Sequence, residues 1–571
     1  MNKRISISLL LLIVSFQTIY TRIITTDDLK AALAEANPGD TIELKSGYYR
    51  DVPYTLKNGT YEKKIKIKSA PNADVDFMGT PSSCIFDDMY IHDVIFEGEM
   101  YLHRALCGIK LLNSSYINIT GLFIVNIEQQ GILISGHHNT IYNNKIFDCV
   151  RENRYDTKSK TSGWSQSVAI WGVKNGVPST YNSVINNIIS FSYGESLYFF
   201  QCEHCVAQQN EITNGLSANI YIDSSKYIDI DGNILRVNST EYDNKYGSAC
   251  GIAMSPDDNN PISYINITNN VILGTRVGIY FFMQDIGGGY NNVRILHNTL
   301  WNVHVTPIWF KKPNTKIYNV FGCEMKNNFI YFEGAKEFEP KNAWDLGYNI
   351  YYNTTIVPTI YSDTTSKAAK NLTLNTVFNQ INSCKDYYNK DLIPDCLRPS
   401  KHPDKLQLYH SGTALKPRVR EDKVYCQRNY YTPSIGAYEF PEECSGDVEP
   451  PTDIPQGDFD VRFNISYCTA GYRVMKLVGS FCNWNVGSGL NMTQVKSCNW
   501  TATIRDGTSL EFKYKFVEAI GSSAYKVESD PYRVFKGSAL ADAARKKPKG
   551  IYENCNYTTI SNLITLACTW R

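Results

Sequence analysis

Acidic side chains follow apolar runs at three places in the middle of the chain. Asp223 ends the run NIYID, Asp257 and Asp258 follow GIAMSP, and Asp285 follows GIYFFMQ. If these runs are stacked strands, carboxylates on neighbouring strands lie about 5 Å apart. That separation matches the carboxylate pair of a retaining glycosidase, and a cluster of carboxylates also suits Ca²⁺.

Three interpretations of this acidic group stay open. Two carboxylates could serve a glycoside hydrolase. Alternatively, Asp223, Asp257 and Asp285 could hold Ca²⁺ against a uronate carboxylate, so that a base removes the adjacent C–H proton in a lyase reaction. Lys311, on the next apolar run, is a candidate for that base or for a stabilising cation. The third interpretation is structural, because aspartate is common in turns and these residues would then form a solvated edge.

The elements that must position these residues belong to an irregular repeat of about 22 residues between Ile117 and Ile330. Each copy joins a β-branched run, an asparagine or an asparagine pair, and a second apolar run. The copies read IYNNKI (141–146), VINNII (184–189), VAQQNEI (206–212), IDIDGNIL (228–235), INITNNVIL (265–273), VRILHNTL (293–300) and MKNNFIYF (325–332). One copy is too small to bury its apolar face, so we expect a coiled chain with parallel strands about 4.8 Å apart. The asparagines are predicted to hydrogen-bond to one another at the bends.

Aligning the second strand of each coil predicts which side chains face outward. The inward position runs Ile132, Val168, Leu197, Ile220, Ile252, Ile279, Ile308. Since side chains alternate along a strand, the next column faces outward and contains Tyr198, Tyr221, Tyr280 and Trp309, with Trp171 two residues further along its own strand. These rings would form an exposed aromatic wall that suits stacking on an extended sugar chain. The alternative is that a long loop packs over them.

The N-terminal sequence TTDDLKAALAEANPGDTIELKSGYY (25–49) predicts a short helix with Thr26 or Asp27 as its N-cap, a turn, and a strand over 41–44. It resembles the N-terminal cap of secreted right-handed parallel β-helix proteins of the pectate-lyase-like superfamily. The segment SIGAYEF (434–440) resembles their closing strand, and the resemblance covers about 24–440. It implies a right-handed parallel β-helix but no single reaction, because this superfamily includes lyases, hydrolases, epimerases and non-catalytic binders. An antiparallel sandwich would need hairpin turns roughly every 8–12 residues.

Two further segments resemble secreted bacterial β-helix proteins. SYGESLYF (192–199) is similar to a G-E-G-I-like segment, and SANIYIDSS (217–225) is similar to the coil that follows it. This resemblance groups Glu195, Asn219, Tyr221 and Asp223 in one candidate region. Glu195 precedes its strand while Asp223 follows its own, an offset of roughly 16 Å, so the two are a poor catalytic pair.

The C-terminal part is predicted to be a separate all-β module, an antiparallel β-sandwich. A linker rich in Pro, Glu and Asp (441–457) precedes it, and the module spans 458–571. MKLVGSFCNWN (475–485), TATIRDGTSLEFKYKFV (501–517) and ESDPYRVF (528–535) resemble a starch- or glycogen-binding domain. That resemblance implies sugar contacts for Trp484, Lys515 and Tyr525, although the family usually has a Trp where this chain has Tyr525. The alternative is an immunoglobulin-like spacer with Trp484 in its core.

The remaining features concern location and partners. Residues 1–21, with Lys3 and Arg4 before an apolar run, resemble a secretory signal peptide, and no later stretch is apolar enough to span a membrane. The 57 basic and 56 acidic residues give no general attraction to nucleic acid. Sixteen cysteines and sequons such as Asn58 and Asn113 fit a secreted, disulfide-bonded glycoprotein. We expect a monomer.

Together these features predict a secreted protein that binds a polysaccharide in an outer groove of a β-helix. Cleavage is expected as well, and a lyase reaction is favoured over a hydrolase reaction. The alternative is a non-catalytic, carbohydrate-binding protein of a cell surface or cell wall.

Overall fold

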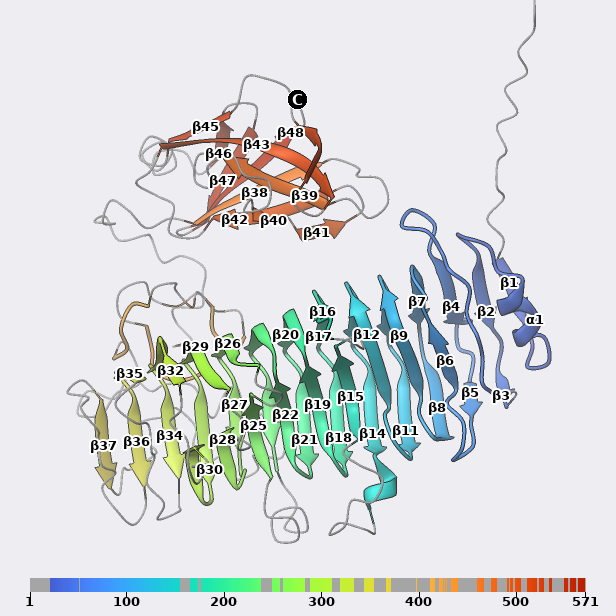
Figure 1. Ribbon diagram of the computed structural model, residues 1–571, viewed down its shortest axis with the longest axis horizontal. Helices are drawn as coiled ribbons and strands as arrows, with labels where there is room; N and C mark the ends of the chain where they lie inside the picture. Colours follow the sequence, from blue (N-terminus) through green and yellow to red (C-terminus); the bar gives the residue numbers. More distant parts are fainter. Residues whose placement is uncertain are drawn as a thin grey trace, which may run out of the picture.

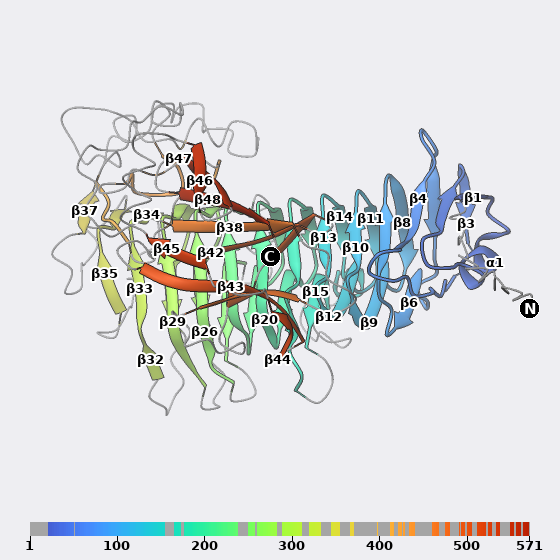
Figure 2. The same ribbon diagram turned by 90° about the horizontal axis from the view of Figure 1, so that it is seen from above.

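The computed structural model describes residues 21–50, 52–154, 165–172, 176–237, 249–256, 260–282, 288–310, 319–332, 344–353 and 366–370, short stretches between 397 and 439, and strands between 460 and 569. The described residues between 21 and 370 form a parallel β-solenoid, in which strands of successive coils lie side by side (Figure 1). The view turned by 90° shows the strands again in parallel order (Figure 2). Each complete coil contributes one strand to each of three rows.

The first row consists of β6 (Phe86–Met89), β9 (Ile109–Ser115), β12 (Ile132–His137), β15 (Gln166–Trp171), β19 (Glu195–Phe200), β22 (Ala218–Asp223), β25 (Cys250–Ser255), β28 (Val277–Phe281) and β31 (Thr306–Phe310). Every neighbouring pair in this row is parallel. The pairing places Ile132, Val168, Leu197, Ile220, Ile252, Ile279 and Ile308 in one column, which confirms the alignment predicted from the sequence.

The second row follows the first along the chain of each coil. It consists of β1 (Thr21–Ile24), β2 (Thr41–Leu44), β4 (Ile65–Ser69), β7 (Val94–Glu97), β10 (Asn118–Thr120), β13 (Thr140–Tyr142), β17 (Ser183–Ile185), β20 (Cys202–Gln208), β23 (Lys226–Asp231), β26 (Ile262–Thr268), β29 (Gly289–Leu296), β33 (Cys323–Lys326) and β35 (Trp344–Gly347). The short strands β16 (Ser179–Thr180) and β32 (Asn319–Phe321) also pair with it.

The third row forms a separate sheet of thirteen strands. It consists of β3 (Gly47–Tyr49), β5 (Val75–Met78), β8 (Met100–Ala105), β11 (Phe123–Ile127), β14 (Lys145–Cys149), β18 (Ile188–Ser192), β21 (Glu211–Gly215), β24 (Ile234–Arg236), β27 (Val271–Leu273), β30 (Thr299–Val303), β34 (Phe329–Phe332), β36 (Ile350–Asn353) and β37 (Lys367–Lys370). A 3₁₀ turn, η1 (Arg151–Asn153), follows β14.

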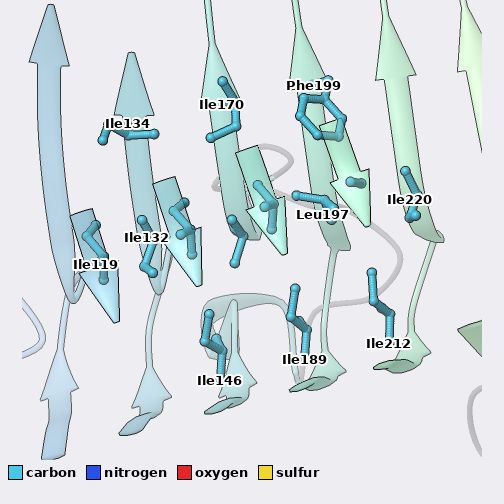
Figure 3. Close-up of a cluster of buried hydrophobic side chains, with 14 of the residues drawn as sticks. Ile119, Ile132, Ile134, Ile146, Ile170, Ile189, Leu197, Phe199, Ile212 and Ile220 are labelled. Atoms are coloured by element: carbon cyan, nitrogen blue, oxygen red, sulfur yellow. The ribbon is translucent and has the colours of Figure 1, made fainter. Parts of the chain in front are cut away.

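The core lies inside the coil, where side chains of the three rows meet. Figure 3 shows Ile132, Leu197 and Ile220 of the first row above Ile146, Ile189 and Ile212 of the third row. All six are fully buried. Burying such a side chain stabilises the fold by about 1.5–3 kcal/mol, and each one also contacts the equivalent side chain of the next coil.

Asparagine side chains stack along the bend between the second and third rows, as the sequence predicted. The amide of each donates to the side-chain oxygen of the next at 2.9–3.0 Å, through Asn144, Asn187, Asn210, Asn233, Asn270, Asn298, Asn328 and Asn349. Four of these residues, Asn144, Asn187, Asn270 and Asn328, are the second member of an Asn pair. The first member adopts a left-handed conformation, as at Asn143, Asn186 and Asn269.

The solenoid extends beyond the repeat that the sequence analysis recognised, which ran from Ile117 to Ile330. Its strands begin near Thr21 and continue to Lys370. The early coils use Gly98 and Gly121, both with positive φ, at the bend where later coils use asparagine. Their core is also aromatic, with Tyr49 stacked on Phe77 at 5.0 Å, so the Asn and Ile signature is missing there.

Helix α1 (Leu29–Ala34) lies beside β1 at one end of the row of strands (Figure 1). Leu29 and Leu33 are buried. The predicted N-cap was wrong: the helix begins after Asp28, which makes no side-chain capping bond and whose carboxylate accepts from the Thr25 hydroxyl at 2.7 Å. The predicted closing strand was also wrong, since residues 433–439 are buried but lack strand pairing.

The C-terminal part contains two sheets. One consists of β41 (Thr493–Lys496), β42 (Asn499–Ile504), β38 (Asp460–Ser466), β48 (Leu563–Thr569), β47 (Cys555–Ile560) and β46 (Lys549–Tyr552). The other consists of β40 (Leu490–Asn491), β39 (Val474–Gly479), β43 (Glu511–Ile520) and β44 (Ser523–Val527), with β45 (Arg533–Lys536) on β43. The pairings are antiparallel except that of β38 with β48, which is parallel and corrects the purely antiparallel prediction.

Candidate functional site

The outer column of the first row is in register across seven coils. Pairing links Leu133, Ala169, Tyr198, Tyr221, Ala253, Tyr280 and Trp309 in that order. A second column, two residues further along, links Ser135, Trp171, Phe200, Asp223 and Ser255. The parallel register therefore gathers most of the described candidate residues on one surface, named here the first-row face.

The rings on the first-row face form two stacked pairs. Tyr198 lies on Tyr221 with 5.3 Å between ring centroids and 18° between planes. Tyr280 lies on Trp309 at 4.8 Å and 23°. Ala253 separates the two pairs, so the aromatic column is interrupted in its middle.

The prediction of an exposed wall was wrong in one respect. Tyr198 is only 9% exposed, and Leu133 and Ala169 beside it are buried too. Tyr221, Tyr280 and Trp309 are half-buried and pack against Ala218, Ala253 and Val277. The face is apolar and partly covered, so a ligand could reach edges and parts of rings rather than a continuous aromatic strip.

A buried hydrogen bond joins the two columns. The Tyr198 hydroxyl donates to Oδ2 of Asp223 at 2.9 Å, and the Ser224 hydroxyl donates to Oδ1 at 2.8 Å. Burial, followed by the negative charge of Asp223, raises the pKa of Tyr198 well above its ordinary value. Tyr198 is therefore a neutral hydrogen-bond donor at physiological pH and is unsuited to act as a base.

Asp223 fits the predicted role of a Ca²⁺ ligand poorly. Both of its oxygens accept hydrogen bonds from the protein, and the residue is 4% exposed. Within the described part of the chain, no group of three His, Cys, Asp or Glu side chains could hold a metal ion. The arrangement instead uses Asp223 to fix the orientation of Tyr198.

Glu195 and Asn219 have structural partners. Glu195 is buried at the start of β19, where the Gln166 amide donates to it at 3.4 Å. Asn219 accepts from the Gly215 amide at 2.9 Å and donates to the Arg236 carbonyl at 3.1 Å. Because Asp223 pairs with Phe200, five residues beyond Glu195, these two carboxylates lie at opposite strand ends, as predicted.

Several candidate residues lie outside the described part of the chain. These are Asp257, Asp258, Asp285, Lys311 and Trp484. Lys515 is placed in β43 and Tyr525 in β44, without a described side chain. Trp171 is described and half-buried at the end of β15, where its ring meets Phe200 edge-on at 6.4 Å.

Sequence reasoning missed a longer aromatic column at the start of the second row. Six rings stack there on consecutive coils: Tyr116, His138, Tyr181, His204, Tyr227 and Tyr264. Each has a positive φ between 54° and 57°. A Tyr directly before the β-branched run, as in KYIDI and SYINI, was the available signal.

Comparisons with known proteins give distant structural similarity alone. No protein-family model and no curated protein matches it. A pectate lyase structure, Pel9A, aligns with a TM-score of 0.45 at 15% identity, covering 74% of this chain and 97% of that one. XylC in complex with xylose aligns at 0.47 and 9% identity, covering 74% and 98%. PfbA, a surface adhesin of Streptococcus pneumoniae, aligns at 0.44 and 13% identity, covering 57% and 85%.

Proposed function

We propose that the protein binds a polysaccharide along the first-row face. The observation that carries this proposal is the register, which stacks Tyr198 on Tyr221 and Tyr280 on Trp309 along the coil axis. Sugar rings present C–H groups that pack on aromatic rings, and a polymer can contact several coils at once. The described residues of the two columns from β12 to β31 include no His, Lys or Arg, so this part of the face favours binding over proton transfer.

A second candidate is cleavage of a uronate polymer by β-elimination. It is supported by the sequence positions of Asp257, Asp285 and Lys311, which follow strands of the first row. In this scheme Ca²⁺ would neutralise the uronate carboxylate and Lys311 would take the neighbouring C–H proton. Asp223 would take no part in Ca²⁺ binding, because its oxygens are engaged by Tyr198 and Ser224.

The proposal includes secretion and a second sugar-binding module. The disulfide between Cys84 and Cys107 supports an oxidising compartment. Among the described residues, the structure has no helix of the length and apolarity needed to cross a bilayer. The C-terminal strands would carry a starch-binding-like site at Trp484, Lys515 and Tyr525, and the linker would keep both sites near one polymer.

The full-length protein tests these proposals directly. Affinity electrophoresis in gels containing pectate, alginate, chondroitin or starch should show retardation, and Tyr221→Ala with Tyr280→Ala should reduce it. Trp484→Ala should reduce retention on starch alone. Ultraviolet absorbance and reducing ends after incubation separate lyase, hydrolase and pure binder. Absence of retardation on every polymer would refute the binding proposal.

A further inference from the structure

A groove of about 620 Å³ lies on the second row of strands, on β20, β23, β26, β29 and β33. Its lining includes Tyr227, Tyr264, Asp229, Asn292, Arg294 and Glu324. The groove lies outside the two columns of the first-row face, so it is a separate candidate binding site.

One wall of the groove is the end of the second-row aromatic column. The ring of Tyr264 stacks on Tyr227 with 4.7 Å between centroids and 7° between planes. The next two positions of the same column are Asn292 and Gly322, which keep the left-handed backbone of the preceding rings. Among the described residues no ring stacks on the other face of Tyr264, and the residue is 47% exposed.

The stacked rings therefore end at Tyr264, while the left-handed backbone positions continue for two more coils. Coils repeat about every 4.8 Å, close to the spacing of the stacked rings, and at the position next to Tyr264 the smaller Asn292 side chain stands in place of a ring, with its oxygen over Gly322. A Cβ at residue 322 would lie 2.4 Å from the Asn292 side-chain oxygen, so the Asn292 amide covers Gly322 and a side chain there would collide with it.

The wall beside this space is polar. A column two residues further along each strand runs through Val206, Asp229, Asn266, Arg294 and Glu324. The Asn266 amide donates to Asp229 at 2.7 Å, and Arg294 forms an ion pair with Glu324. The space thus has one aromatic wall and an adjacent row of hydrogen-bonding groups.

We propose that this groove binds a neutral pyranose unit of a glycan, which stacks on Tyr264 in the place of the missing ring. Axial C–H groups would pack on the exposed face of Tyr264, and hydroxyls would hydrogen-bond to Asp229, Asn292 and Arg294. The lining contains the carboxylates of Asp229 and Glu324 against the single guanidinium of Arg294. This balance disfavours uronates and favours uncharged sugars.

Saturation-transfer NMR on the full chain tests the proposal, with cello-, xylo- and malto-oligosaccharides as neutral probes and oligogalacturonates as acidic probes. A neutral probe should bind the wild type and Tyr264→Phe, which keeps the stacking face. Tyr264→Ala should weaken binding about tenfold. Asn292→Tyr should abolish it, because Tyr264 shows that this backbone conformation accepts tyrosine and the new ring fills the space.

Tyr90→Ala is the matched control. Tyr90 is 67% exposed, has the same left-handed conformation and lies outside the groove, so its removal should leave binding unchanged. No binding of any neutral probe, equal binding of oligogalacturonate that Tyr264→Ala weakens to the same extent, or unchanged binding of the neutral probe in Tyr264→Ala would each overturn the proposal. Loss of binding in Tyr221→Ala with Tyr280→Ala, but not in Tyr264→Ala, would place the sugar on the first-row face. Loss of binding in Tyr264→Ala alone would support the groove site and contradict the proposal that the sugar binds the first-row face.

Discussion

At the scale of single residues, the hydroxyl of Tyr198 makes the clearest contribution. It donates to the buried carboxylate of Asp223, which also accepts from the Ser224 hydroxyl. Tyr198→Phe leaves that carboxylate short of one donor at almost unchanged volume. We expect the free energy of unfolding, measured by urea denaturation, to fall by about 1–3 kcal/mol. Tyr90→Phe, at an exposed ring, should change stability by less than about 0.5 kcal/mol. Equal effects of the two substitutions would contradict the role assigned to the bond.

His138 gives a second prediction at this scale, concerning pH. Burial, followed by the charge of His137, lowers the pKa of His138 from 6.5 to about 4. The unfolded chain therefore binds a proton more readily than the folded chain between these values. The stability due to neutral His138 is complete above pH 6.5 and is lost as the pH falls toward about 4.

His138→Tyr removes this titration while keeping a ring between Tyr116 and Tyr181. Thermal melts across this pH window should show a smaller acid-induced drop in Tm for the variant than for the wild type. His103→Tyr, in the third row, serves as the comparison outside the stack. An identical drop in wild type and His138→Tyr would show that His138 does not cause the acid sensitivity.

At the scale of elements, the asparagine stack holds one coil to the next. The Asn187 amide donates to the Ile141 carbonyl at 2.9 Å and to Asn210 at 3.0 Å, and its oxygen accepts from Asn144. Asn187→Ala leaves buried partners on both neighbouring coils without their hydrogen bonds. We therefore expect the free energy of unfolding to fall by about 3 kcal/mol or more. The adjacent Asn186 is exposed and left-handed, so Asn186→Gly should cost less than about 1 kcal/mol. Chemical denaturation compares the two, and similar losses would contradict the difference.

The same stack explains how much of the fold the sequence could predict. The Asn pairs and the Ile columns predicted the parallel coils and the register of Tyr198 with Tyr221, because equivalent positions of successive coils stack. The coils before Ile117 were not recognised because their bends lack the asparagine, as at Gly98, which turns the chain without a repeated side chain. The burial of Tyr198 and the polar partners of Asn219 could not be predicted, since they depend on contacts between rows that alternation along one strand does not reveal.

At the scale of the whole molecule, residues described between 411 and 439, named here the return segment, pack along the bends of the later coils. Carbonyls of this segment accept from the first members of the Asn pairs: Glu421 from Asn269 at 2.9 Å, and Thr413 from Asn327 at 2.8 Å. The Gly436 amide donates to the Asn327 carbonyl at 2.8 Å. The left-handed asparagines thus serve both the bend and a distant part of the chain.

A buried ion pair holds the return segment together. Arg428 and Glu439 have fully buried side chains with 3.6 Å between Nη1 and Oε2, and Arg428 also donates to Asn269 at 2.7 Å. Arg428→Met removes the cation and leaves Glu439 buried without it, which should destabilise the segment by about 3–5 kcal/mol. Amide exchange at Thr413, Gly436 and Ala437 should then accelerate, while exchange in the early coils stays slow. Adding Glu439→Gln removes the stranded charge and should restore part of the protection. Unchanged exchange in Arg428→Met would mean that the asparagine bonds alone hold the segment in place.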